Sequence, residues 1–246
     1  MPLLQADGIS VQFGGLQALA DVDLDVEAGG ITGLIGPNGA GKTTMFNVIC
    51  GLQPTTRGRV TFDGHEVTGQ KTHERARLGI ARTFQRLEVF GSLTARENIL
   101  VAAEIRGRWS SEKVDAHKVT DEILARCDLK RVADHRVDTM PTGLARTVEL
   151  GRALATAPKM LLLDEPSSGL SEDETVFFAA LLRSLTAEGL GILLVEHDVE
   201  LVMDVCERIH VLDFGRKIAA GTPKEVQSDA AVQAAYLGST GEDDAA

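Results

Sequence analysis

The stretch from Gly36 to Thr44 reads GPNGAGKTT and contains the pattern G-x-x-x-x-G-K-[ST], which is typical of a phosphate-binding loop. An apolar run over 31–35 precedes it and a helical pattern over 42–50 follows it, so we expect a strand, a loop and a helix. Glycines let backbone amides converge on phosphate oxygens, and the helix N-terminus adds positive potential. The predicted nucleotide-binding residues of this stretch are Gly36, Pro37, Asn38, Gly39, Ala40, Gly41, Lys42, Thr43 and Thr44.

Three side chains of this loop have specific expected partners. Lys42 is expected to reach the β- and γ-phosphates, Thr43 to bind Mg²⁺ and Thr44 to contact an α-phosphate oxygen. Two carboxylates form a second constellation, because Asp164 and Glu165 directly follow the apolar strand predicted over 160–163. The carboxyl edge of a parallel sheet is where open α/β sheets bind ligands. We therefore expect Asp164 to bind Mg²⁺ and Glu165 to act as the general base for an attacking water.

The remaining pattern predicts an α/β chain. Alternating apolar residues over 9–13 and 22–26 indicate an antiparallel β layer, and a further β pair is expected at 60–62 and 80–83. A helix over 172–188 joins the apolar strands 160–163 and 192–195, which is typical of a parallel sheet covered on both faces. Two short strands are expected at 209–212 and 217–219. The apolar face predicted for the helix consists of Val176, Phe177, Ala180, Leu181 and Leu185.

The middle of the chain has a helical character. Thr94 and Glu97 have capping-box spacing, so a helix should begin there and run to about Arg106, and a second helix is expected from about Ser111 to Cys127. β-type patterns are absent from 87 to 157 and resume only at Met160. We therefore predict a single domain with a core formed by 1–86 and 158–238, an inserted helical subdomain at 87–157 and a disordered acidic tail at 239–246.

Composition excludes several classes of protein. The 246 residues contain 25 Lys+Arg and 36 Asp+Glu, a formal charge of −11, which argues against binding to nucleic acid. No apolar run approaches the roughly 20 residues that cross a bilayer. The N-terminus has no basic start or sustained apolar stretch, so it does not indicate a signal peptide. We expect a cytoplasmic protein.

Four blocks in order along the chain resemble an ABC-type ATPase domain, which implies a P-loop NTPase core of the RecA-like kind. They are Gly36 to Thr44, Phe84-Gln85, Leu163-Asp164-Glu165-Pro166 with the following Ser167-Ser168-Gly169-Leu170, and Glu196-His197-Asp198. The resemblance implies that the chain hydrolyses ATP. It implies that Gln85 lies between Mg²⁺ or the lytic water and the subdomain joint, and that His197 hydrogen-bonds the γ-phosphate.

Site roles follow from the motifs and the resemblance together. The candidate catalytic residues are Glu165, His197, Gln85 and Lys42, and the candidate metal ligands are Thr43, Gln85 and Asp164. The resemblance also favours stacking of Phe13 on adenine, although an aromatic in an alternating strand is as often part of the core. Arg75, Arg77, Arg82 and Arg86 cluster near the joint after Gln85, either as functional residues or as a solvated face.

The signature segment of the family, usually Leu-Ser-Gly-Gly-Gln, departs from the usual pattern. It occurs here as Met140, Pro141, Thr142, Gly143 and Leu144, with proline in place of the serine that would touch the γ-phosphate across a dimer interface. Proline suits the first turn of a helix, and Thr142 can restore a hydroxyl. Loss of one hydrogen bond to a charged group costs about 1.5–3 kcal/mol. The departure therefore predicts that ATP hydrolysis is slowed but not abolished.

Nearly the whole chain resembles the ATP-binding subunits of branched-chain amino-acid importers. The segments concerned are Phe13 to Leu16, His73 to Gln85, Leu93-Thr94 with Glu97-Asn98, and Ala235 to Gly238. This resemblance implies a peripheral protein on the inner face of the cell membrane. Its implied partners are two membrane-spanning permease subunits, a second ATPase subunit, like or unlike, and indirectly an external solute-binding protein.

Two alternatives remain open at this point. One is the ATPase of a lipopolysaccharide-type lipid extraction or export system, which resembles the same subgroup. The other is a non-transport ABC ATPase acting on DNA or ribosomes, which the net charge of −11 disfavours.

Overall fold

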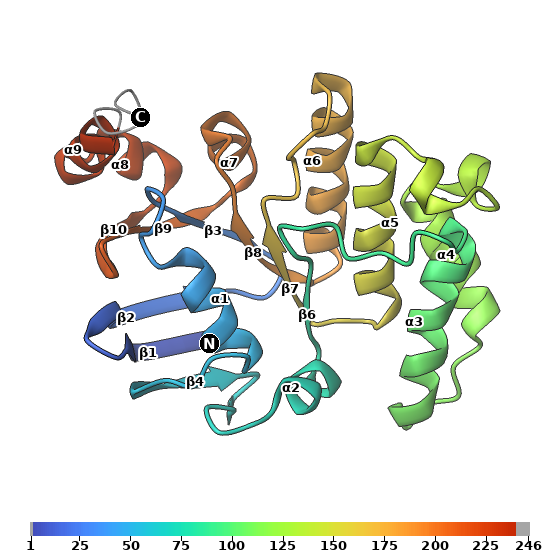
Figure 1. The fold of residues 1–246 in the computed structure, drawn as a ribbon, viewed down its shortest axis with the longest axis horizontal. Coiled ribbons are helices and arrows are strands. Elements are labelled where there is room, and N and C mark those ends of the chain that lie inside the picture. The colour runs from blue at the N-terminus through green and yellow to red at the C-terminus, as the bar shows by residue number, and fades with distance from the viewer. Residues whose placement is uncertain (1, 240–246) are drawn as a thin grey trace.

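The computed structural model describes residues 2–239 of the chain, so the predicted tail at 239–246 lies outside the described residues apart from Ser239. Two β-sheets organise the fold (Figure 1). The smaller sheet is antiparallel in the order β2-β1-β4-β5, with β1 Leu4–Phe13, β2 Leu16–Val26, β4 Arg57–Phe62 and β5 His65–Glu66. The predicted antiparallel layer is therefore confirmed.

The larger sheet has six strands in the order β10-β9-β3-β8-β7-β6. Neighbouring strands are parallel from β9 to β6, and β10 is antiparallel to β9. The bounds are β3 Ile31–Ile35, β6 Ile80–Arg82, β7 Met160–Asp164, β8 Gly191–Val195, β9 Arg208–Asp213 and β10 Arg216–Gly221. The predicted parallel sheet, and with it the α/β fold class, is confirmed.

The predicted β pair of 60–62 and 80–83 is wrong as a pair. Both strands form, but β4 pairs with β1 and β5 in the small sheet, whereas β6 pairs with β7 in the large one. Helix α2, Thr72–Leu78, separates them and carries the chain from one sheet to the other. The apolar pattern predicts where strands form, but it does not indicate which of the two sheets each strand joins.

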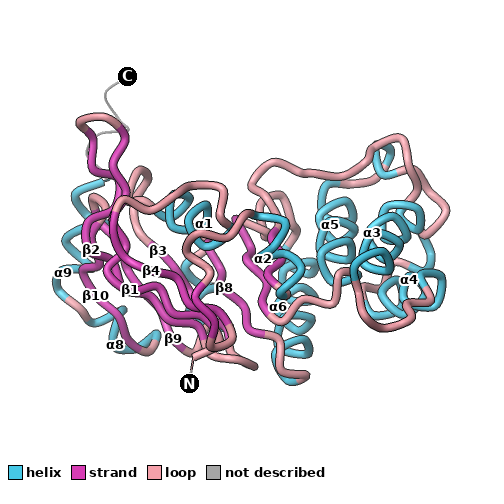
Figure 2. The backbone as a smooth tube through the Cα atoms, turned by 90° about the horizontal axis from the view of Figure 1, so that it is seen from below, coloured by secondary structure: helices cyan, strands magenta, loops and turns pink. Residues whose placement is uncertain are grey.

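The helices pack on both faces of the large sheet or on one another. They are α1 Lys42–Cys50, α2, α3 Ala95–Trp109, α4 Ala116–Arg126, α5 Thr142–Ala155, α6 Glu172–Ala187, α7 Val199–Val205, α8 Pro223–Ser228 and α9 Ala230–Ser239, with 3-10 turns η1 Lys130–Val132 and η2 Val137–Thr139. Both views place α3, α4 and α5 together at one end of the molecule and α8 and α9 at the other (Figures 1 and 2). In the described part of the chain, no helix is long and apolar enough to cross a bilayer.

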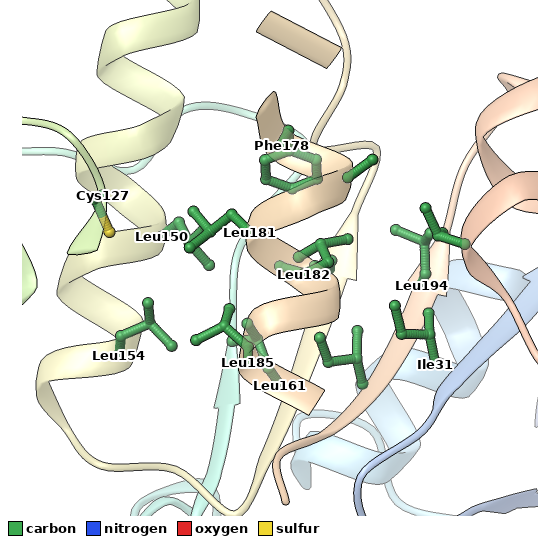
Figure 3. Packing of buried hydrophobic residues seen from close by; sticks show 14 of the residues in the cluster. Ile31, Cys127, Leu150, Leu154, Leu161, Phe178, Leu181, Leu182, Leu185 and Leu194 are labelled. Carbon is green, nitrogen blue, oxygen red and sulfur yellow. The ribbon is translucent and has the colours of Figure 1, made fainter. Parts of the chain in front are cut away.

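Alternation along the strands divides the core into two clusters. Met160 and Leu162 of β7 face α1 and the small sheet, whereas Leu161 and Leu163 face α5 and α6. Figure 3 shows Leu161 among the leucines of α5 and α6. The second cluster runs without a break from α3 and α4 to the sheet, so the subdomain boundaries at 87 and 157 remain a prediction.

Helix starts follow their capping residues. Thr94 and Glu97 form the predicted capping box, with Thr94 N–H donating to Glu97 Oε2 at 2.8 Å and Glu97 N–H to Thr94 Oγ1 at 3.1 Å. The second predicted helix begins at Ala116 rather than Ser111, because Asp115 caps it through Lys118 N–H at 3.1 Å. Helices α2, α7, α8 and α9 were not predicted.

The predicted apolar face of α6 is partly wrong. Leu181 and Leu185 are buried, but Val176, Phe177 and Ala180 are exposed, and Phe178 takes the core position. The buried stripe of α6 is therefore shifted by about one residue, because the sheet beneath it decides which of two adjacent phenylalanines is covered.

Two adjacent substitutions test this packing. Phe178, 5 % exposed, loses its core contacts in Phe178→Ala, which should lower the free energy of unfolding by about 3–5 kcal/mol. Phe177, 41 % exposed, is the matched control, and Phe177→Ala should cost less than about 1 kcal/mol. Urea unfolding of the three proteins measures both values. Equal losses would contradict the assigned face of α6.

Candidate functional site

The loop between β3 and α1 requires glycine at two positions. Gly36 has φ of 150°, and a Cβ there would lie 2.1 Å from the carbonyl oxygen of Leu212. Gly41 has φ of 105°, and its Cβ would lie 2.7 Å from the Leu19 side chain. Among residues 2–239 no side chain caps α1, and its first turn contains no acidic residue, so its N-terminal amides can bind an anion. The predicted strand, loop and helix are confirmed.

Lys42 is folded back over this loop. Its Nζ donates to the carbonyl oxygens of Gly36 at 2.6 Å and Pro37 at 3.0 Å. Burial lowers the pKa of Lys42, while the charges of Glu165 and Asp164 act in the opposite direction. The ammonium group therefore lies between the loop and the two carboxylates, where a phosphate anion would be bound by charge as well as by hydrogen bonds.

Asp164 ends β7 and is held by Arg82 of the neighbouring strand β6. Arg82 Nη2 lies 2.8 Å from Asp164 Oδ2, with the two side chains 7 % and 5 % exposed. Arg82 Nη1 donates to Asn47 Oδ1 at 2.6 Å, and the guanidinium group lies over the rings of Phe46 and Phe84. The buried charge of Asp164 is thus already paired, as a carboxylate in the interior requires.

The arginine cluster predicted near Gln85 does not act as one unit. Arg75 is buried and donates to backbone carbonyls, including those of Val48 and Ile49 at the end of α1. Arg82 is paired as described above, and Arg77 and Arg86 are exposed. The solvated-face interpretation therefore holds for two members and fails for the two that the fold buries.

Glu165 stands at the centre of three converging side chains. Gln85 Nε2 donates to Glu165 Oε2 at 3.1 Å, and His197 Nε2 lies 2.8 Å from Glu165 Oε1. The three residues follow β6, β7 and β8, which are adjacent parallel strands, so their loops meet at one edge of the sheet. Glu165 itself has φ of 49° in the left-handed region, which turns the chain sharply after Asp164.

A buried carboxylate lies behind this group. Glu196 accepts the backbone N–H of Ser167 at 2.7 Å and that of His197 at 3.2 Å. Burial raises the pKa of Glu196, although these amide hydrogen bonds favour its ionised form. It fixes the backbones that carry His197 and the loop after Glu165. Sequence reasoning named Glu196 only as part of a motif and assigned it no role.

A pocket of about 520 Å³ unites most of the predicted residues. Its lining includes Phe13, the loop residues from Asn38 to Thr44, Gln85, Glu165 and His197. Gly36 and Pro37 form the start of the loop, and Asp164 is buried beneath the pocket. A cavity of this size suits a small-molecule ligand, and its mixture of glycine amides, a lysine and carboxylates suits a nucleotide with its phosphates.

Two aromatic residues flank the pocket opening. Phe13, at the end of β1, is 48 % exposed, so it is not a core residue and the alternative interpretation of it fails. Phe214, in the turn between β9 and β10, is 88 % exposed with φ of 41°, and sequence reasoning missed it. The signal was present, since Phe214-Gly215 separates the two predicted short strands.

The segment Met140 to Leu144 lies outside this pocket, at the start of α5. Pro141 occupies the N-cap position rather than the first turn, which makes Thr142 the first helical residue. Pro141 and Thr142 are exposed, whereas Gly143 is buried so close to Glu174 that a Cβ would lie 2.4 Å from that carboxylate. The segment therefore presents a helix N-terminus to the surface and not to its own chain's pocket.

Comparisons with known proteins point to one family. Residues 19–168 match a family model described as ABC transporter, and residues 216–242 match one described as branched-chain amino acid ATP-binding cassette transporter. The chain is 37 % identical over 250 residues to BraF of Pseudomonas aeruginosa, a high-affinity branched-chain amino acid transport ATP-binding protein, with 96 % of this chain and 98 % of BraF covered.

Two further similarities have comparable coverage. LptB of Haemophilus influenzae, a lipopolysaccharide export system ATP-binding protein, is 34 % identical over 238 residues, covering 97 % of this chain and 98 % of LptB. Among solved structures, MJ1267, an ATP-binding cassette of an ABC transporter, superposes with a TM-score of 0.87 at 31 % identity, covering 96 % of this chain and 99 % of that one.

Substitution of Glu165 tests its expected role as general base. In Glu165→Gln the contacts of Gln85 and His197 can persist while proton acceptance is lost, so ATP affinity should change little and turnover should fall by about 10²–10⁴-fold. Glu104→Gln, which alters an exposed carboxylate on α3, is the control. Phosphate release and calorimetric titration separate the two effects. Unchanged turnover in Glu165→Gln would rule out this base.

Proposed function

This chain belongs to the ATP-binding subunits of ABC transporters, and we propose that it couples ATP hydrolysis to the uptake of branched-chain amino acids. The family expected from the four sequence blocks is therefore confirmed. The C-terminal match over 216–242 is the observation that carries the solute class. The described part of this segment contains β10, α8 and α9, and its Tyr236 hydrogen-bonds the backbone of Gly36 in the phosphate loop.

ATP would enter the 520 Å³ pocket with its base beside Phe13 and its phosphates over the loop 36–44. Lys42 would then donate to phosphate oxygens instead of the carbonyls of Gly36 and Pro37. Thr44 would contact the α-phosphate. For Lys42, charged phosphate oxygens would replace neutral carbonyl oxygens as acceptors, which strengthens its hydrogen bonds.

Glu165 would accept the proton of the attacking water. Gln85 and His197 contact different oxygens of its carboxylate, so together they fix its orientation. His197, half exposed, would also donate to the γ-phosphate. Its backbone N–H is held by Glu196, which fixes the point from which the imidazole reaches the pocket.

The pocket also offers ligands of the type that Mg²⁺ prefers. Thr43 and Gln85 line the pocket with a hydroxyl and an amide oxygen. Asp164 is buried and bound to Arg82 through Oδ2, so it would offer its other carboxylate oxygen. Oxygen ligands of these kinds fit this hard cation. Among residues 2–239 there is no group of three or more His, Cys, Asp or Glu that could hold a metal ion by itself. This fits a cation that arrives with ATP and is bound mainly by phosphates and water. Bound Mg²⁺ would neutralise charge on the phosphates.

A separate groove supports a membrane partner. A cavity of about 410 Å³ lies between α2 and β6 on one side and α3 and α5 on the other, and Phe84 and Glu88, the neighbours of Gln85, help to line it. The exposed apolar residues Leu52, Phe90 and Ile105 also belong to its lining. The occupant we propose is an amphipathic helix of a permease subunit, since such helices place apolar anchors into grooves of this kind. Docking there would place this chain at the inner face of the cell membrane, with the external solute-binding protein as an indirect partner.

A second ATPase subunit would complete the site. The start of α5, where Thr142 is exposed and Gly143 is covered by Glu174, lies outside the pocket of its own chain, so a head-to-tail pair would bring it to the phosphates of the other subunit. The Pro141 N-cap leaves the amides at the start of α5 for the anion. The partner subunit can be a second copy or a related ATPase.

Lipopolysaccharide export is the second candidate function. The 34 % identity to LptB over nearly the whole chain supports it, because both kinds of relative share the cassette. The membrane subunits bound at the groove decide between the two, since the solute does not reach this chain.

Leucine uptake tests both the solute class and the groove. In the organism that carries this chain, deletion of its gene should abolish uptake of radiolabelled leucine, and the wild-type gene should restore it. Ile105→Glu places a charge in the groove and should fail to restore uptake, although the purified variant keeps its ATPase activity. Ile105→Leu is the apolar control and should restore it. Normal leucine uptake with loss of surface lipopolysaccharide would overturn the proposal in favour of lipid export.

ATP-dependent pairing tests the second ATPase subunit. Glu165→Gln with MgATP should double in mass by light scattering, because bound ATP joins the two chains and hydrolysis no longer releases them. Lys42→Ala, which removes the main phosphate contact, is the control and should stay monomeric. A monomeric Glu165→Gln protein with bound ATP would contradict a dimer of like subunits.

A further inference from the structure

The loop that carries Gln85 has no helix or strand between β6 and α3 in the described chain. Its backbone is held instead by side chains of α5. Glu149 Oε1 accepts the N–H of Glu88 at 3.0 Å and that of Phe84 at 3.5 Å. These two amides bracket Gln85, so one carboxylate holds both ends of the short stretch that contains it.

Arg146, one turn before Glu149, holds the carbonyl groups of the same stretch. Its Nη1 donates to Phe84 O at 2.9 Å and its Nη2 donates to Gln85 O at 2.5 Å. Arg146 and Glu149 also form an ion pair at 3.3 Å, with side chains 10 % and 6 % exposed. Arg152, on the following turn, donates to Glu88 O and lies over the Phe90 ring.

Helix α5 therefore connects two functional elements of one chain. Thr142 and Gly143 lie at its N-terminus, and Arg146 lies one turn further along the same helix. Arg146 contacts the backbone of Gln85, Glu149 holds the amides of Phe84 and Glu88 on either side of it, and the Gln85 side chain reaches Glu165. Burial raises the pKa of Glu149, while its amide and arginine contacts favour the charged form.

We propose that Glu149 and Arg146 are positioning residues that fix Gln85 against Glu165 and make the Gln85 loop move together with the start of α5. The role rests on the proposed function, because the start of α5 serves the opposite ATP site only in a dimer. The residues themselves do not touch the nucleotide. They act on hydrolysis through Gln85, which a geometric displacement of about 1 Å would take out of position.

The direct test is amide hydrogen exchange combined with kinetics. In Glu149→Ala, the peptide covering 84–88 should exchange faster, while the phosphate loop and α5 keep wild-type protection. ATP affinity should be unchanged, and turnover should fall on the order of 10- to 100-fold. Glu149→Gln keeps an acceptor oxygen for the two amides and should recover most of the protection and turnover. Glu122→Ala, on the exposed side of α4, is the control.

A double-mutant cycle separates positioning from a general structural role. If Glu149 acts through Gln85, Glu149→Ala should lower turnover in the wild-type background and have little further effect in Gln85→Ala. Equal losses in both backgrounds, or wild-type exchange of 84–88 in Glu149→Ala, would overturn the inference. Failure of the parent protein to bind MgATP would instead overturn the proposed function, which the exchange data do not depend on.

Discussion

Parallel pairing of β3, β8, β7 and β6 is the constraint on which the site depends. Each strand ends at the same edge of the sheet, and each is followed by a residue or loop of the pocket. Backbone hydrogen bonds fix the register, with Leu162 opposite both Arg82 and Leu193. Side chains 80 positions apart in sequence, those of Gln85 and Glu165, meet because their strands are neighbours. The chemistry at Glu165 is therefore a consequence of strand order.

Buried charge is concentrated around that edge. Asp164, Arg82, Glu149 and Arg75 all lie in the interior and all have partners, several of them backbone groups at the ends of helices or in loops. Such groups are costly to bury alone, so each requires its partner to remain in place. The network thereby orders backbone segments that have no regular secondary structure, above all the stretch around Gln85.

Sequence reasoning predicted the parts of the fold that local pattern specifies. The phosphate loop, the two carboxylates at the end of β7 and the capping box at Thr94 depend on residues close together in the chain, and each lies where it was expected. Helix α8 was missed although Thr222, Pro223 and Glu225 give a clear start signal. The local signal for α8 was therefore present in the sequence but was overlooked.

Features that depend on tertiary neighbours were not predictable in the same way. Alternation could not assign β4 and β6 to different sheets, and helical spacing could not decide whether Phe177 or Phe178 faces the core. The pairing of Arg82 with Asp164 joins residues 82 positions apart. The hydrogen bonds from the Phe84 and Glu88 amides to Glu149 could not be predicted from the sequence either, because an acidic residue on a helix is usually solvated.

The five-residue strand β7 has a consequence for how this chain tolerates changes in length. Its alternate residues belong to the two separate clusters, and its last residue is Asp164. An inserted residue within 160–163 would swap the faces of every following side chain and shift the carboxylates by about 3.3 Å along the strand axis. The connection between α3 and α4, at 110–115, packs little against either cluster. Among related sequences, insertions and deletions should therefore be frequent in that connection and rare in β7.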